Sequence, residues 1–340
     1  MKILFRTEAG PLIGAGHAMR CFALAQACRD AEAEVQFLMA KTLPNVASRL
    51  SDDGIECVTT SMQPGSPEDA AHTVELAISG GCRWVVLDGY VFGADFQQTL
   101  KNANLRVLFI DDYGHAAHYC ADVILNQNVY ATAGLYPSRD AATRLLLGTG
   151  YVLLRREFAR WKDWRRPASA QASRLLVSFG GTDPVNATQQ VIEALRDLPD
   201  AELEVVVVTT RPIDSPRVRV ADSVDRMDEL MVWADVALTA SGTTSWELAY
   251  MQTPQIVMPI AENQRQIAMA LVECGVAINL GWYADMSADR LVETVRQLRN
   301  DMMQRDAMAQ AGRALIDGLG ASRIAAHMVD PQNSSEQDFS

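Results

Sequence analysis

Short apolar runs alternate with longer helix-forming runs along the whole chain. In the first half, the apolar runs predict strands at residues 2–6, 35–40, 57–60, 84–90, 107–112 and 122–128. Helix-forming runs between them lie at residues 17–31, 46–54 and 95–103. Strands that are apolar almost throughout and alternate with helices are typical of a parallel sheet covered on both faces.

The same pattern starts again after residues 155–173, which are charged and aromatic and then small and polar. We interpret that stretch as a helix followed by a linker. Beyond it, strands are predicted at 175–179, 202–210, 218–224, 235–241, 255–260 and 276–280. Helices are predicted at 186–198, 227–234, 244–252 and 262–275, and a last helix at 289–316 is expected to split in two.

These two series predict an α/β protein of two domains, which the length of 340 residues allows. We expect an N-terminal domain at 1–150, a linker at 151–172 and a C-terminal domain at 173–329. The last helix of the second domain can pack back on the first. The polar residues 330–340 are expected to form a disordered tail.

The charge and the cysteines narrow the class of protein. A net charge of −12 argues against nonspecific binding to nucleic acid and against docking on anionic membranes. No apolar leader and no run long enough to span a bilayer is visible, so we expect a cytoplasmic protein without membrane insertion. The six cysteines are scattered, as expected of free thiols. His115 and His118 are three apart with no obvious third ligand, so we expect no metal site.

Polar or glycine residues follow several predicted strands where each strand ends. Ligands of open parallel sheets bind outside the carboxyl ends of the strands, so these positions are candidates for a site. They are His17, Asp88, Tyr90, Asp111, Asp112, Gly180 to Asp183 and Ser241 to Thr244. Together they outline a cleft between the two domains.

His17 has a distinctive setting among these residues. It stands in the turn GPLIGAGHAMR, residues 10–20, where a helix begins and where Ser, Thr or Asp is the usual cap. The helix dipole favours a neutral imidazole there, and a neutral ring can accept a proton. We therefore take His17 as a candidate general base on a loop shaped by Gly14 and Gly16, a surface histidine being the alternative.

Two turns in the second half are candidate anion sites. In SFGGTDP, residues 178–184, Gly180 and Gly181 let the backbone approach a ligand, although a plain strand-to-helix turn explains them equally well. In ASGTTSWE, residues 240–247, a helix begins after a small-residue turn, and its amides can hold a diphosphate. Glu247 in that helix can accept hydrogen bonds from a ribose, or it is simply a solvated carboxylate.

The motifs together resemble a known family. MKILFRTEAGPLIGAGHAMRCFALA, LDGY, FIDD, DVILNQN, LLGTGYVLLRREF, SFGGTDP, TASGTTSWE and PIAENQRQIA occur in this order. This series resembles the UDP-2,4-diacetamido-2,4,6-trideoxy-β-L-altropyranose hydrolases of pseudaminic acid biosynthesis. That family is related to the GT-B glycosyltransferases, above all the peptidoglycan N-acetylglucosaminyltransferase. The resemblance covers residues 1 to about 280 and implies two Rossmann-like domains facing a cleft.

The resemblance also implies a reaction and assigns residues to it. It implies inverting, metal-independent hydrolysis of the UDP-sugar, without a cofactor, with His17 taking a proton from the attacking water. Asp88 and Tyr90 would contact the sugar, as would the loop with Gly14 and Gly16. UDP would lie on the second domain. The residues implied there are Gly180, Gly181, Val224, Met227, Ser241, Gly242, Thr243, Thr244, Glu247 and Asn263.

Some alternatives stay open from the sequence. Glu8 is a rival base, and His115 and His118 either line the sugar pocket or lie in a surface loop. A GT-B glycosyltransferase would use the same UDP-sugar site with an acceptor in place of water. A nucleotide-sugar sensor would lack the base, and a NAD enzyme would need the third glycine that the first loop lacks. We expect a monomer whose partners are the UDP-sugar and water.

Overall fold

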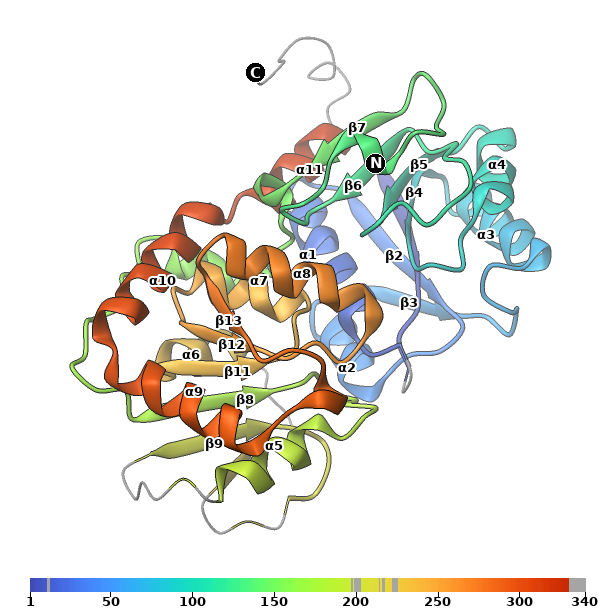
Figure 1. Ribbon diagram of the computed structural model, residues 1–340. Helices are drawn as coiled ribbons and strands as arrows, with labels where there is room; N and C mark the ends of the chain where they lie inside the picture. The colour runs from blue at the N-terminus through green and yellow to red at the C-terminus, as the bar shows by residue number, and fades with distance from the viewer. Residues whose placement is uncertain are drawn as a thin grey trace. The chain divides into compact units, whose positions relative to one another are not determined.

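The structure is a computed structural model that describes residues 1–10, 13–196, 198, 203–213, 215, 218–221 and 226–329. Contacts among these residues divide the chain into two compact units (Figure 1). Unit 1 contains Met1–Arg156 and the described residues from Gly318 onward, and unit 2 contains Glu157–Asp317. The predicted tail at 330–340 lies outside the described residues.

Unit 1 is built on a seven-stranded parallel sheet, and the apolar runs predict six of its strands. Its strands are β1 (Lys2–Thr7), β2 (Glu34–Met39), β3 (Glu56–Thr59), β4 (Cys82–Asp88), β5 (Arg106–Ile110), β6 (Val123–Asn126) and β7 (Arg144–Leu147). They lie in the order β3-β2-β1-β4-β5-β6-β7. This is the Rossmann order, and the direction of winding reverses between β1 and β4.

Helices cover both faces of this sheet. They are α1 (Gly16–Asp30), α2 (Pro44–Asp52), α3 (Pro67–Ser79), α4 (Ala94–Asn102) and α11 (Gly320–Val329), with short 3₁₀ turns η1 (Ala133–Leu135) and η2 (Thr149–Tyr151). Successive residues of β1 feed opposite faces. Ile3 and Phe5 pack in the core under α1, α2 and α11, whereas Leu4 packs in the core under α3 and α4.

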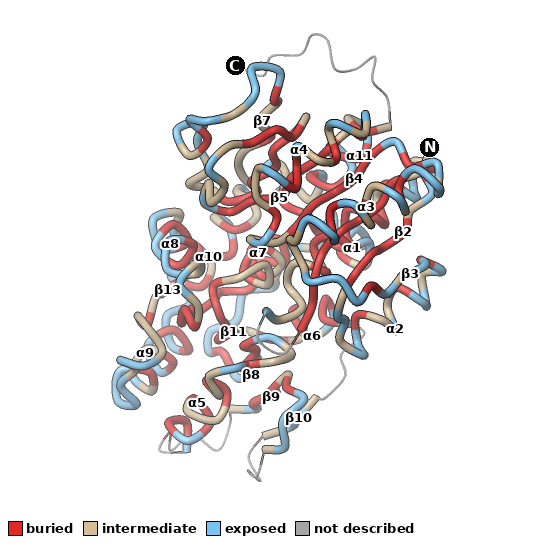
Figure 2. Tube along the Cα trace, turned by 90° about the vertical axis from the view of Figure 1, so that its right-hand side faces the viewer, coloured by how far each residue is buried: buried red, intermediate tan, exposed pale blue. Residues whose placement is uncertain are grey.

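Unit 2 repeats the architecture with six parallel strands. They are β8 (Arg174–Ser178), β9 (Glu204–Val208), β10 (Val218–Ala221), β11 (Val236–Thr239), β12 (Gln255–Val257) and β13 (Ala277–Asn279). The order is β10-β9-β8-β11-β12-β13, so the winding reverses between β8 and β11. The inner strands of both sheets are buried, whereas the edge strands β3 and β10 and one side of the helices are exposed (Figure 2).

The helices of unit 2 agree with the sequence pattern in number and place within the described residues. They are α5 (Ala187–Leu195), α6 (Met227–Trp233), α7 (Thr243–Tyr250), α8 (Glu262–Glu273), α9 (Ala288–Asn300) and α10 (Met302–Leu315). Two 3₁₀ turns accompany them, η3 (Arg156–Trp161) and η4 (Tyr283–Asp285), and η3 begins at the last residue of unit 1. The long last helix splits at Asp301, as predicted. The Asp301 carboxylate accepts from the Gln304 amide over 2.8 Å and starts a new helix there.

The stretch expected as a helix and a linker differs from that expectation. Residues 156–161 form the 3₁₀ turn η3, and residues from Glu157 belong to unit 2. Arg166 explains this, because its half-buried guanidinium donates to the carbonyls of Met231, Ala234 and Gln252 over 2.6–2.7 Å. Burial lowers the pKa of Arg166 to about 10. The stretch is therefore fastened to unit 2 instead of hanging free.

Helix α11 returns the end of the described chain to unit 1. It packs beside α1 (Figure 1), and Ile324 and Met328 are fully buried there. The indole of Trp84 on β4 donates to the carbonyl of Met328 over 3.1 Å. Gly320 is required at the start of the helix because a Cβ would overlap the backbone of Val152.

Candidate active site

The first candidate site lies at the carboxyl edge of the sheet in unit 1. Thr7 and Asp88 are register partners at the ends of β1 and β4, the two strands between which the winding reverses. The turn after β1 leads into α1, which begins at Gly16, so His17 lies in the first turn of that helix. A crevice at such a reversal is the usual ligand site of this sheet topology.

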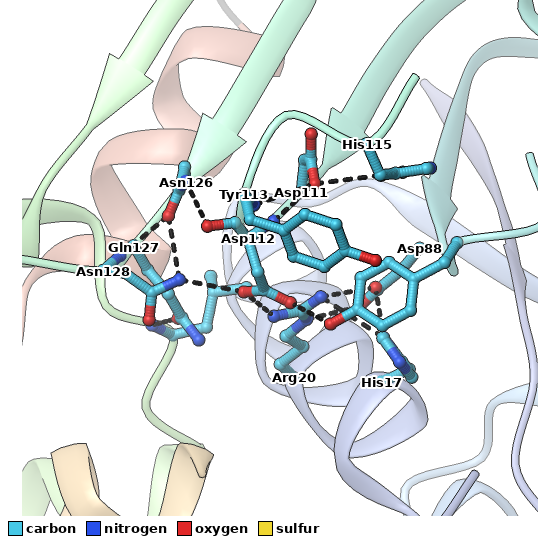
Figure 3. Close-up of polar contacts among 12 residues, drawn as sticks. His17, Arg20, Asp88, Asp111, Asp112, Tyr113, His115, Asn126, Gln127 and Asn128 are labelled. Carbon is cyan, nitrogen blue, oxygen red and sulfur yellow. Dashed lines mark hydrogen bonds and ion pairs between the residues drawn. The ribbon is translucent and has the colours of Figure 1, made fainter. Parts of the chain in front are cut away.

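His17 and Asp88 form a hydrogen-bonded pair. The Nδ1 atom of His17 lies 2.6 Å from Oδ1 of Asp88, which is fully buried (Figure 3). A carboxylate oxygen cannot accept from a bare nitrogen, so Nδ1 carries the hydrogen, and in the neutral ring Nε2 carries the lone pair. Among the described residues, Nε2 has no hydrogen-bond partner. The ring can therefore accept a proton at Nε2 while Asp88 holds its orientation.

Arg20, one turn further along α1, holds the same carboxylate. Its Nε and Nη2 atoms donate to the two oxygens of Asp88 over 2.6 and 2.7 Å. Its Nη1 atom donates to Oδ1 of Asp112 over 2.8 Å, at the turn that follows β5. Arg20 and Asp112 are both 5% exposed, so this guanidinium bridges two buried carboxylates.

The buried charges shift the pKa values of these groups in a consistent way. Burial alone raises the pKa of the Asp88 carboxyl, but the charges and hydrogen bonds of Arg20 and His17 outweigh it and lower the pKa. The same competition, again won by Arg20, puts the pKa of Asp112 far below its usual range. Burial lowers the pKa of Arg20, but the carboxylates of Asp112 and Asp88 outweigh burial and raise the pKa above its usual value. All three groups stay charged at neutral pH.

Tyr90 connects the second carboxylate to the histidine. Its hydroxyl donates to Oδ2 of Asp112 over 2.7 Å, and its ring meets the His17 ring edge-on at 5.1 Å between centroids. On its other side, Tyr90 contacts the rings of Tyr113 and His115. The sequence-predicted residues His17, Asp88 and Tyr90 are thus brought together.

Asp111 has a local structural role. Its oxygens accept from the backbone amides of Asp112, Tyr113 and Gly114, and Oδ1 also pairs with Nδ1 of His115 over 3.0 Å. Burial raises the pKa of Asp111, but hydrogen bonds from the side chains of His115 and Tyr119 and from the Tyr113 amide lower it overall. The carboxylate shapes the turn that presents Asp112 to Arg20.

The end of β6 adds amide side chains to the same network. Asn128 donates from Nδ2 to Oδ1 of Asp112 over 3.0 Å, and Asn126 donates to the carbonyl of Asp112 over 2.9 Å (Figure 3). Gln127 turns away and accepts from the amide of Leu153. Helix α1 and the carboxyl ends of β4, β5 and β6 therefore all contribute to one polar cluster.

Glu8, the rival base, is engaged elsewhere. It is 5% exposed, forms an ion pair with Arg6, and accepts from the amides of Ala40 and Lys41 over 3.0 and 3.1 Å. Arg6 in turn holds Asp69 of α3 through two hydrogen bonds. Both oxygens of Glu8 are thus committed to joining β1 to the loop after β2.

The second candidate site lies at the equivalent edge in unit 2. The ends of β8 and β11 lie side by side, since Ser178 and Thr239 are register partners. Helix α7 starts at Thr243, and among the described residues no side chain caps it. The amides of Thr243 and Thr244 belong to the first turn, where a helix has no internal acceptor. This end of α7 can therefore hold an anion such as a phosphate.

The neighbouring turn after β8 is occupied by its own carboxylate. Asp183 accepts from the amides of Ala187 and Thr188 over 2.9 and 2.8 Å at the start of α5. Gly180 has a φ of +85°, which favours glycine, and the carbonyl of Gly181 accepts from the Thr210 hydroxyl. Because Asp183 fills the helix start, α7 is the better anion site of the two.

The other predicted residues of unit 2 lie around α7 in varied roles. The Ser241 hydroxyl donates to the carbonyl of Gln264 over 2.9 Å and so ties the loop to α8. Glu247 is half-buried within α7, and Asn263 lies in the first turn of α8. Met227 is buried at the start of α6. Val224 lies outside the described residues.

The two histidines of the loop after β5 take separate partners. His115 binds Asp111, whereas His118 contacts Ser138 and Asp140 on the surface. Ligand atoms of His118, Cys120 and Asp140 lie within 4.8 Å of one another. Both ring nitrogens of His118 already have hydrogen-bonding partners, which accounts for this grouping without an ion.

Sequence reasoning missed Arg20 and the asparagines. Arg20 stands three residues after His17, so both occupy one face of α1. An arginine inside the apolar run MRCFALA was the signal, because a buried guanidinium needs carboxylate partners. The NQN triplet that ends β6 was a second signal.

Comparisons with known proteins agree with this architecture. Residues 174–323 match the glycosyltransferase family 28 C-terminal domain. An uncharacterized protein from Methanocaldococcus jannaschii, MJ1062, is 24% identical over 78% of this chain and 57% of its own length. A UDP-2,4-diacetamido-2,4,6-trideoxy-β-L-altropyranose hydrolase from Campylobacter jejuni is 27% identical over 57% of this chain and 66% of its own. The chain thus spans less than two thirds of these relatives.

Solved structures match almost the full length. MurG from Acinetobacter baumannii has a TM-score of 0.67 at 15% identity and covers 96% of this chain and 99% of its own. MnaA from S. aureus, solved with UDP, has a TM-score of 0.71 at 14% identity, with both chains covered completely. The chain has the two-domain GT-B fold. None of the helices in the described part combines the length and apolar character needed to cross a membrane.

Proposed function

We propose that the protein is a sugar-nucleotide enzyme that hydrolyses UDP-2,4-diacetamido-2,4,6-trideoxy-β-L-altrose to the free sugar and UDP, in pseudaminic acid biosynthesis. The observation that carries the proposal is the His17–Asp88 pair at the edge of the sheet. With its hydrogen on Nδ1, the neutral imidazole has Nε2 available to accept a proton. The name of the Campylobacter relative supports the substrate. We propose that the enzyme acts in the cytoplasm as a monomer.

In the proposed reaction, His17 is the general base. Its Nε2 takes a proton from water as the water oxygen bonds to the anomeric carbon. The bond from that carbon to the diphosphate oxygen breaks on the opposite face, so the configuration inverts. UDP leaves as an anion with the bonding electron pair. Asp88 stabilises the imidazolium that forms, because its carboxylate already accepts from Nδ1 over 2.6 Å.

The diphosphate is proposed to bind unit 2 at the start of α7. Amides of Thr243 and Thr244 and the helix dipole can stabilise the charge of the leaving group, so the proposed step needs neither a metal nor a general acid. Gly180, Gly181, Glu247 and Asn263 remain proposed contacts of the nucleotide. In unit 1, Tyr90 and the loop with Gly14 and Gly16 are proposed to contact the sugar.

The structure changes the role that we propose for Asp88. Both of its oxygens already accept from His17 and Arg20, so it has little capacity left for a sugar hydroxyl. We therefore assign it to orienting the base. Glu8 is dropped as a base because Arg6 and two backbone amides occupy it.

The test is release of UDP from this UDP-sugar with EDTA present and no acceptor added. Wild type is expected to release UDP, and His17→Gln is expected to lose about 100-fold or more of kcat, the range of a general base. His72→Gln is the matched control, because His72 lies on α3 next to Glu75 and away from the cluster. Release that survives in His17→Gln would remove His17 from the mechanism.

A GT-B glycosyltransferase with a UDP-sugar donor is the second candidate. The match of residues 174–323 to a glycosyltransferase domain favours it. The two functions differ in one result. A transferase releases UDP only when an acceptor is added, whereas the hydrolase needs water alone. Acceptor-dependent release by wild type would therefore replace the hydrolase by the transferase.

A further inference from the structure

Arg20 joins the two carboxylates of the polar cluster, Asp88 and Asp112, through one guanidinium. On one side it holds Asp88, which orients His17. On the other it holds Asp112, which accepts from the hydroxyl of Tyr90. The base and the phenol are thus both positioned through one guanidinium (Figure 3).

The charges in this cluster do not balance while His17 is neutral. Asp88 and Asp112 carry two negative charges and Arg20 carries one positive charge, and all three side chains are at least nine-tenths buried. One negative charge is left over. It is neutralised when Nε2 of His17 takes a proton, because the ring then carries the missing positive charge.

We propose that Arg20 and Asp112 are positioning residues of the hydrolysis. Arg20 fixes Asp88 and Asp112, and Asp112 supplies the second negative charge that favours proton uptake by His17. The proposal rests on the proposed function for its effect on turnover. Its electrostatic part concerns the free protein and holds for any reaction in which His17 accepts a proton.

The groups that face His17 come from three elements. Arg20 lies on α1, Asp88 ends β4 with Tyr90 just after it, and Asp112 follows β5, while the Cys21 thiol of α1 contacts Asp88. Burial raises the pKa of Cys21 well above its usual value, so its thiol stays neutral. The charged groups joined to His17 through Arg20 and Asp88 are therefore one cation and two anions, and Asp111 in the turn after β5 is paired with His115 instead.

Asp112→Asn is the informative variant. It removes the charge but keeps the shape, and its amide oxygen can still accept from Arg20 and Asn128. Two results are expected. First, kcat falls about 10- to 100-fold because Tyr90 loses its acceptor and the cluster loosens. Second, the acidic limb of the pH–rate profile moves to lower pH, because a proton on His17 is no longer favoured by the lost charge.

Arg20→Lys tests the bridging role. A lysine ammonium cannot hold the two oxygens of Asp88 and also reach Asp112, so kcat is expected to fall at least as far as in Asp112→Asn. Asp69→Asn is the matched control. Asp69 is a fully buried carboxylate in unit 1 that is held by two hydrogen bonds from Arg6, away from the cluster. It is expected to lose stability and keep the pH profile.

NMR of ¹⁵N-labelled histidine can monitor the titration of the His17 ring without substrate. This measurement separates the inference from the proposed function. A shift of the titration to lower pH in Asp112→Asn but not in Asp69→Asn supports the inference even if wild type proves to need an acceptor. An unchanged titration in Asp112→Asn overturns it, even if wild type hydrolyses the UDP-sugar.

Discussion

The imidazole of His17 donates from Nδ1 to the carboxylate of Asp88 over 2.6 Å, although the two residues are 71 positions apart in the chain. The pairing of β1 with β4 brings them together, since the loop that carries His17 leaves β1 where Asp88 ends β4. The contact therefore depends on the strand order and not on any local motif.

Asp88→Asn is expected to lower kcat by about 100-fold or more with a small change in KM. The amide can present a donor to Nδ1 and so favour the tautomer that has its hydrogen on Nε2. UDP release at saturating substrate measures the effect. Asp122→Asn is the control, because Asp122 is a paired carboxylate of unit 1 that binds Lys101 outside the cluster. Equal losses in both variants would indicate general destabilisation instead.

The sequence was sufficient for the two parallel sheets but not for every element. Helix α3, strand β7 and helix α11 lie outside the predicted elements, and residues 157–172, which the sequence pattern assigns to a linker, belong to unit 2. Helix α11 is defined by burial of Ile324 and Met328 on a unit that lies far away in sequence. Local periodicity cannot indicate such a partner, and the hydrogen bonds of Arg166 to distant carbonyls are equally non-local.

The candidate site was predictable in part. His17, Asp88 and Tyr90 stand at strand ends, which is where sheet topology places ligands. The bridge through Arg20 was not predictable, because an arginine at that position of a helix also suits a solvent-exposed face. What decides its role is burial together with two carboxylates on separate strands, which only the folded chain shows.

Glu8→Gln is expected to destabilise unit 1 by about 1–3 kcal/mol, because a buried charged acceptor of Arg6 and of two backbone amides is lost. Turnover of the folded protein should stay close to wild type. Urea unfolding measures the first effect, and UDP release measures the second. A variant that keeps its stability but loses 100-fold of kcat would return Glu8 to the list of candidate bases.

Gly242→Ala is expected to weaken UDP binding about tenfold, since a methyl group would stand at the amides that we propose to hold the diphosphate. A Cβ there meets only Gln264, at an ordinary 3.8 Å, and the φ of −116° suits alanine, so the fold is not disturbed. Gly93→Ala is the control, because Gly93 also precedes a helix and has space for a Cβ. Calorimetric titration with UDP compares them, and equal affinity in both variants would move the diphosphate away from α7.

Acid is expected to weaken unit 1 through Asp88 and Asp112, whose pKa values are lowered in the folded state by Arg20 despite burial. Carboxyls of this kind stabilise the fold above their unfolded pKa of about 3.9 and lose that contribution as the pH falls toward the folded value. Asp112→Asn lacks one such carboxyl, so its deficit in unfolding free energy should be largest near pH 7 and shrink below about pH 4. Urea unfolding measures this deficit in unfolding free energy, and hydrogen exchange of the β4 and β5 amides is the readout that restricts the measurement to unit 1. A deficit that stays constant or grows with acid would show that the charge of Asp112 does not stabilise the fold.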